Sequence, residues 1–168
     1  IMTPTLTEHW IATADAARIA LFVCRLSPGG DLRVDHARSL ESPHREEHER
    51  HRPSLLAGAG SNGTLSRSGV HAAPQAASND RDEDEDQRRF ARHIGAWLSH
   101  AARDLGAGHV SVFAAPRLLG LLREELARHP AVRADLHPGE ITHLRAAELA
   151  KHAAVRSVVL TQSGAAMR

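Results

Sequence analysis

Residues 109–116, which read His-Val-Ser-Val-Phe-Ala-Ala-Pro, place a short apolar strand directly before a proline that can open a helix. The helix after Pro116 is expected to run to about His129, because its leucines recur at helical spacing. Before the strand, residues 87–105 also carry apolar side chains at helical spacing. The order helix, strand, helix predicts a sheet with helices packed on it.

Three short strands are predicted near the start of the chain, over residues 10–14, 18–24 and 32–36. Their connections are short, and residues 27–31 form a run of turn-forming residues, Ser-Pro-Gly-Gly-Asp. Consecutive strands joined by short turns favour an antiparallel meander.

The last part of the chain is also expected to alternate between strand and helix. Residues 140–142 are predicted as a short strand and residues 146–152 as a helix, while residues 155–160 fit either a last strand or a continuation of that helix. The whole order is three strands, a long loop, then helix, strand, helix, strand and helix. This order predicts an α/β fold with a mixed sheet in three layers, which is the ribonuclease H-like layout.

A single α/β domain is expected over residues 1–154, with a C-terminal extension over residues 155–168, because 168 residues suit one domain. Residues 40–86 are rich in Gly, Ser, Pro and charge, which predicts a long flexible loop before the first helix. The acidic run at residues 80–86 ends this loop, where negative charge favours the start of a helix.

Composition excludes several classes of protein. The chain has 21 Lys and Arg residues against 20 Asp and Glu residues, so no global charge excess indicates a nucleic-acid partner. Cys24 is the one cysteine, which excludes a disulfide scaffold, and its apolar strand predicts a buried side chain. No apolar run approaches the roughly 20 residues that span a bilayer. A cytoplasmic location without a membrane span is therefore expected.

Three segments carry a family resemblance. Residues 14–22 read Ala-Asp-Ala-Ala-Arg-Ile-Ala-Leu-Phe, residues 89–92 read Arg-Phe-Ala-Arg, and residues 112–123 read Val-Phe-Ala-Ala-Pro-Arg-Leu-Leu-Gly-Leu-Leu-Arg. These segments resemble the bacterial host attachment protein family, which is related to the middle domain of archaeal and eukaryotic release factors. The resemblance covers about residues 10–152. The chain departs from the family pattern at His51, where Asp is common, and at Ala115, where Pro is frequent.

The resemblance implies a role near translation, with tRNA, the ribosome or another RNA-bearing molecule as partner. Related release-factor domains act through a Gly-Gly-Gln loop tip placed beside the ester of peptidyl-tRNA. The sequence contains no Gly-Gly-Gln, because Gly29 and Gly30 are followed by Asp31. We therefore expect a non-catalytic binding protein. A hydrolase acting on RNA or on an aminoacyl- or peptidyl-tRNA ester is one alternative. A protein-interaction module that affects attachment to host cells indirectly is the other.

Asp15 is the one candidate for a catalytic residue, because it ends the first predicted strand, where a ribonuclease H-type nuclease places a metal-binding carboxylate. The strand ending at Ala114 is followed by Ala-Pro-Arg and offers no second carboxylate. A single carboxylate does not make a two-metal site, and an Asp in this position is common in turns.

His44 and His48 are the candidates for metal ligands, because residues 44–48 match the pattern His-x-x-Glu-His. On a helix the two imidazoles would share a face and could bind zinc. The segment is polar throughout and offers no buried face to support such a site. We therefore expect neither a metal site nor a cofactor.

Arginines are the candidates for RNA binding, because guanidinium groups donate paired hydrogen bonds to phosphate. Arg52, Arg67 and Arg117 are predicted to contact RNA. The chain has no Tyr and three Phe residues, so it has few aromatic rings on which bases could stack. Recognition of RNA by shape and phosphate is the mode that this composition allows.

Overall fold

The mixed sheet that organises the fold has the strand order β3-β2-β1-β4-β5. In this computed structural model, residues 6–43 and 75–166 are described. The meander comprises β1 (Thr7–Ala14), β2 (Arg18–Leu26) and β3 (Leu32–Glu41), which pair antiparallel. Strands β4 (His109–Ala114) and β5 (Arg133–Pro138) continue the sheet parallel to β1. The predicted meander and central strand are confirmed.

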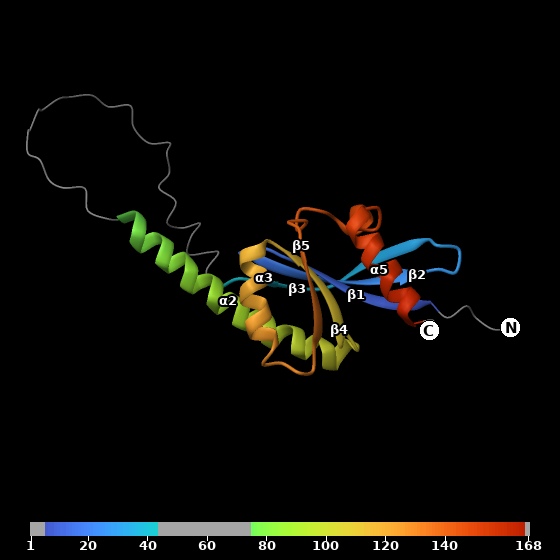
Figure 1. Ribbon diagram of the computed structural model, residues 1–168, viewed down its shortest axis with the longest axis horizontal. Helices are drawn as coiled ribbons and strands as arrows, with labels where there is room; N and C mark the ends of the chain where they lie inside the picture. The colour runs from blue at the N-terminus through green and yellow to red at the C-terminus, as the bar shows by residue number, and fades with distance from the viewer. Residues whose placement is uncertain (1–5, 44–74, 167–168) are drawn as a thin grey trace, which may run out of the picture.

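Helices cover both faces of the sheet (Figure 1). One face packs against α2 (Gln75–Leu105) and α3 (Pro116–Leu126), and the other against α4 (Ala146–Leu149) and α5 (Ala153–Ala166). The fold is α/β, with three layers and a mixed sheet, and its strand order is that of the ribonuclease H-like layout, as the element order predicts.

Alternation along the strands builds two separate cores. Ala12 and Ala14 of β1 face α2 and α3, where they meet Ile94 and Leu98. Ile11, which precedes Ala12 and points to the opposite side of the sheet, faces the second core. That second core also holds the buried side chains of Phe22, Cys24, Phe113, Leu149, Val155 and Val159. Cys24 is fully buried, as the sequence predicts.

The structure corrects three boundaries. Helix α2 begins at Gln75, so the acidic run at residues 80–86 lies within the helix and not in the loop before it. The strand predicted at residues 140–142 is wrong: the last strand is β5, which starts at Arg133. The helix predicted over residues 146–152 is shorter, because α4 ends at Leu149, and a separate helix, α5, begins at Ala153.

Helix α5 contains residues 155–160, so the helical alternative for this stretch is the correct one. Val155 and Val159 recur at i and i+4 and are both fully buried. Gln162 of the same helix donates a hydrogen bond of 2.7 Å to the hydroxyl of Ser111 on β4. Val155, Val158 and Val159 therefore pack on the sheet and complete its second core.

Candidate nucleic-acid interface

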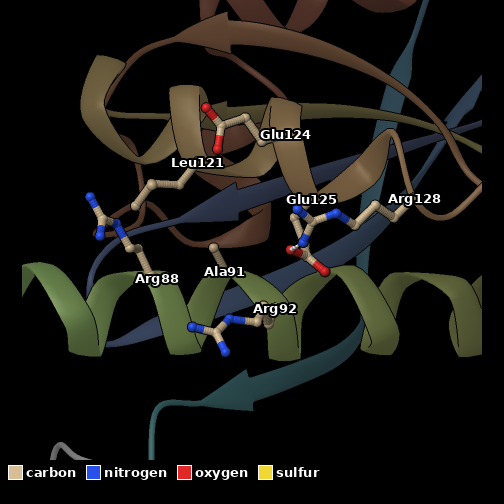
Figure 2. A pocket seen from close by; sticks show the side chains of 7 residues that line it. All are labelled: Arg88, Ala91, Arg92, Leu121, Glu124, Glu125 and Arg128. Carbon is tan, nitrogen blue, oxygen red and sulfur yellow. Dashed lines mark hydrogen bonds and ion pairs between the residues drawn. The ribbon is translucent and has the colours of Figure 1, made fainter.

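A groove runs along the line where α2 and α3 meet (Figure 2). It consists of two adjoining cavities of about 270 and 440 Å³ that share Arg88, Leu121 and Glu124. Together the two cavities are lined by five arginines and three carboxylates: Arg88, Arg92, Arg117, Arg123, Arg128, Asp84, Glu124 and Glu125. The groove is therefore charged, with a local excess of cations.

Small residues bring the two helices together beneath these charges. Ala91 of α2 forms part of the groove lining, and Gly95 lies one turn further along. A Cβ atom on Gly95 would lie 2.9 Å from both Cγ of Glu125 and Cδ2 of His129. The missing side chain thus allows α3 to approach α2 closely. Pro116, which has no backbone N–H to leave unsatisfied, fixes the start of α3 beside the groove.

Ion pairs hold most of the groove arginines in place. Arg117 of α3 forms an ion pair with Asp84 of α2. Arg89 and Arg92 share the carboxylate of Glu85, at 3.4 and 3.3 Å. Arg128 pairs with Glu125 of its own helix at 3.1 Å. The acidic run thus supplies carboxylates that orient the arginines around it.

Arg88 and Arg123 differ from these neighbours. Neither forms an ion pair or a side-chain hydrogen bond with any residue in the part of the chain that the structure describes. Both line the larger cavity, one from α2 and the other from α3. Two guanidinium groups without a carboxylate partner in this part of the chain thus face the same hollow from opposite helices.

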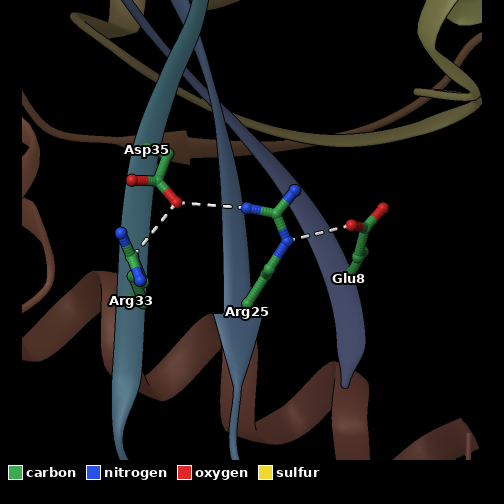
Figure 3. A network of polar contacts seen from close by, with 4 residues as sticks. All are labelled: Glu8, Arg25, Arg33 and Asp35. Atoms are coloured by element: carbon green, nitrogen blue, oxygen red, sulfur yellow. Dashed lines mark hydrogen bonds and ion pairs between the residues drawn. The ribbon is translucent and has the colours of Figure 1, made fainter. Parts of the chain in front are cut away.

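Two arginines on the meander, Arg25 and Arg33, are neutralised by comparison (Figure 3). Arg25 lies between two carboxylates, with Nε 3.0 Å from Glu8 and Nη1 3.1 Å from Asp35. Arg33 lies 3.4 Å from the same oxygen of Asp35. These four side chains come from β1, β2 and β3 and carry no net charge. They form a ladder of cross-strand pairs rather than a site for an anion.

The sequence-predicted RNA contacts fall in different places. Arg117 lies in the groove, where it is paired with Asp84 and remains more than half exposed. Arg52 and Arg67 lie outside the described residues, as do the proposed metal ligands His44 and His48. Sequence reasoning missed Arg88. Its position three residues before Ala91, on the helix face that α3 covers, is the signal that could have placed it in the groove.

Asp15 lies in the turn between β1 and β2. Its Oδ1 accepts hydrogen bonds from the backbone N–H groups of Ala17 and Arg18, at 2.8 and 2.9 Å. Its Oδ2 lies 3.8 Å from Nε of Arg18. These contacts are those of an Asp that closes a turn. Its catalytic role stays a prediction.

Over residues 6–43 and 75–166, no three His, Cys, Asp or Glu side chains are grouped so that they could hold a metal ion. The closest pairing of this kind joins His109 Nε2 to Asp135 Oδ2, at 2.7 Å on neighbouring strands. This pair is partly exposed at the start of β4.

A buried polar cluster lies beneath α5. His9 Nε2 is 2.8 Å from the hydroxyl of Ser163, which itself donates to the carbonyl of Val159 at 2.9 Å. Since that hydroxyl has one proton, His9 must donate to Ser163 through Nε2–H. Burial lowers the pKa of His9 below its ordinary value of 6.5, and the nearby His109 adds to this effect. The Ser163 hydroxyl thus accepts from His9 and donates to the backbone of its own helix.

Comparison with known protein families identifies the family of this chain. Residues 10–153 match the family described as "Protein required for attachment to host cells". The chain belongs to this host attachment family. The match agrees with the resemblance seen in residues 14–22, 89–92 and 112–123. No curated protein matches the chain.

Among solved structures, a Thermus thermophilus RuvC structure is similar to the host attachment protein at 12% sequence identity and a TM-score of 0.36. The match covers 77% of this chain and 61% of that one, so the chain spans less than two thirds of that protein. The observed strand order, and not this similarity, establishes the α/β class. In the described part of the chain, no helix is long and apolar enough to cross a membrane.

Proposed function

We propose that this host attachment protein is a non-catalytic RNA-binding protein, whose α2/α3 groove holds the phosphate backbone of a tRNA, of the ribosome or of another RNA-bearing partner. The observation that supports the proposal is the position of Arg88 and Arg123. Both line the larger cavity from facing helices and have no carboxylate partner among the described residues. Guanidinium groups without a carboxylate partner can form paired hydrogen bonds with phosphate.

The chemistry of the groove suits binding rather than catalysis. Arginine stays protonated at any physiological pH, so Arg88 and Arg123 cannot act as general bases. The ion-paired Arg92, Arg117 and Arg128 add positive charge around the two unpaired groups. Phosphate contacts of this kind fix the position of an RNA without reading its bases. This agrees with a chain that has few aromatic rings for stacking.

The acidic run limits how RNA can approach. Residues 80–86 lie on α2 just before Arg88, and their carboxylates repel a phosphate backbone. An RNA must therefore enter the groove from the α3 side, where Arg123 and Arg128 lie. The same carboxylates would weaken binding to arbitrary polyanions. The proposal thus predicts a preference for a shaped RNA surface over a flexible single strand.

The first experiment is sucrose-gradient co-sedimentation of the protein with ribosomes and with free RNA at low and high salt. Co-migration that weakens steeply as salt rises is the expected result, because phosphate contacts release counterions. A protein that stays at the top of the gradient at low salt would overturn the proposal. Co-migration that survives nuclease treatment would also overturn it, in favour of a protein partner.

Variants then locate the interface. Arg88→Glu and Arg123→Glu are expected to weaken tRNA binding, and a single Arg→Ala change at either position should reduce the salt slope by about 1. Arg133→Glu is the matched control, because Arg133 is exposed at the start of β5, away from the residues that line the groove. Fluorescence anisotropy with labelled tRNA measures all of these variants. Equal losses in the groove variants and in the control would show that net charge, and not the groove, binds RNA.

A further inference from the structure

Another cavity, of about 310 Å³, lies on the opposite face of the sheet from the α2/α3 groove. Its walls come from the meander and from the segment around residues 142–146 that leads into α4. Ala20 and Phe22 of β2 and Thr13 of β1 line it from the sheet, and Leu144 and Ala146 close it from the other side. Its polar and charged lining comprises Arg18, His36, Ser39, Glu41 and Arg145.

The cavity exists because helices cover this face unevenly. Helix α5 packs over the half of the face where Ile11 and Cys24 lie. Helix α4 spans four residues, Ala146–Leu149, and leaves the far end of β2 uncovered. The small side chain of Ala20 lies between Arg18 and Phe22 along this face of β2. A larger residue at position 20 would fill the hollow.

One wall of the cavity is aromatic and fixed in place. The register between β2 and β3 shifts after Leu21, which puts His36 opposite Phe22. The two rings meet edge to face, with centroids 5.5 Å apart. His36 Nε2 lies 2.9 Å from the hydroxyl of Ser39, which sets the orientation of the imidazole. The wall therefore offers two aromatic rings, set nearly at right angles, against which a planar ring can pack.

Two arginines, Arg18 on β2 and Arg145 on the segment before α4, line the cavity together with one acidic residue, Glu41. Arg18 Nη2 donates a hydrogen bond of 2.9 Å to the carbonyl of Thr142, which ties the segment before α4 to the sheet. Arg145 lies exposed on the same segment and forms no ion pair with any described residue. Thr13, a buried residue of β1, also lines the cavity. Two guanidinium groups thus line one cavity.

We propose that this cavity binds a small organic anion with a planar ring, of the size and chemistry of a nucleoside monophosphate. The ring packs against Phe22 and His36, and the phosphate pairs with Arg18 and Arg145. A volume of about 310 Å³ falls at the lower end of the range for pockets that hold small ligands. The site is independent of the RNA-binding groove, since it lies on the other face of the sheet and shares no residue with it.

Calorimetric titration of the full chain with AMP, adenosine and inorganic phosphate tests the proposal. AMP is expected to bind, and adenosine and phosphate should each bind at least about tenfold more weakly, because each makes a part of the contacts. The imidazole signals of His36 should shift on addition of AMP in an NMR spectrum. A titration without heat and without such shifts would overturn the proposal.

Variants separate this site from general charge effects. Arg145→Ala should weaken AMP binding about tenfold, since it removes a charge-assisted hydrogen bond. Arg133→Ala, the matched control, should leave it unchanged, as should Arg88→Glu in the groove. Ala20→Leu should abolish binding by filling the cavity. Arg145 is exposed, so its replacement keeps the test valid even where Ala20→Leu fails to fold. Equal affinities for Arg145→Ala and Arg133→Ala would contradict the assigned site.

Discussion

His9 Nε2 and the hydroxyl of Ser163 lie 2.8 Å apart and join β1 to α5 across 154 residues of sequence. A second bond from Gln162 to the buried Ser111 lies beside it on β4. Both polar contacts are flanked by Val155 and Val159, which pack into the second core. The C-terminal helix is therefore held by apolar packing and by two partly buried hydrogen bonds, and its removal would expose the centre of the sheet.

The packing of α5 predicts a clear difference between two neighbouring residues. Val159→Ala should destabilise the protein by about 2 kcal/mol, because Val159 is fully buried and loses two methyl groups. Leu160→Ala should change stability by less than about 0.5 kcal/mol, because Leu160 is 50% exposed. Urea unfolding followed by circular dichroism measures both. Similar losses of stability for the two variants would mean that Val159 does not pack into the second core.

The buried imidazole of His9 predicts a loss of stability in acid. Its pKa is lowered in the folded state, mainly by burial, so the unfolded chain binds the proton more readily. The stability that neutral His9 contributes is fully present above its unfolded pKa of 6.5 and is lost as the pH falls through the lowered folded pKa. His9→Gln keeps a donor for Ser163 and cannot be protonated.

Unfolding curves at several pH values below neutrality test this prediction. The His9→Gln variant should lose less stability than the parent between neutral and mildly acidic pH. The exposed residue His143 offers the matched control, and His143→Gln should follow the parent. If His9→Gln and the parent lose the same stability on acidification, the acid sensitivity arises from other groups.

The turn at Asp15 gives a third prediction. Asp15→Ala should cost about 1 kcal/mol, because two backbone N–H groups lose their acceptor. Asp15→Asn keeps that acceptor, and the exposed pair with Arg18 that it loses is worth little. Thermal unfolding should therefore separate the two variants. An RNA-cleaving activity that depends on the carboxylate would be lost in both, so stability and activity together distinguish a turn residue from a catalytic one.

The parts of the fold that sequence reasoning predicted have a strong local pattern. Phe90, Ile94 and Leu98 recur at helical spacing, and they are the buried face of α2. Strand β5 has a much weaker pattern, because it is six residues long, has Ala134 and Leu136 as its alternating apolar residues, and ends at Pro138. Asp135 finds its partner in His109, which is 26 residues away in the sequence. A contact of this kind cannot be read from neighbouring residues.

The candidate site shows the same limit. Arginines could be counted from the sequence, but their value for binding depends on which of them are paired. Arg117 is the predicted contact, yet it is bound to Asp84, which lies on another helix. Arg88 was not among the RNA contacts predicted from the sequence, yet it lines both cavities of the groove. The distribution of partners follows from the close packing of α2 on α3, which is a tertiary property.

That close packing makes a last prediction, from two glycines with opposite surroundings. Gly120→Ala should stabilise the protein by about 0.5 to 1 kcal/mol, because a Cβ atom there meets nothing within 4 Å and alanine favours the helix. Gly95→Ala gains the same helical preference but places its Cβ atom 2.9 Å from Glu125 and His129. Overpacking costs about 1 to 3 kcal/mol, so we expect a net loss of stability. Denaturant unfolding of both variants measures the contrast. Should Gly95→Ala stabilise the protein as much as Gly120→Ala does, α3 would lie further from α2 than described, and the groove proposed to bind RNA would lose its shape.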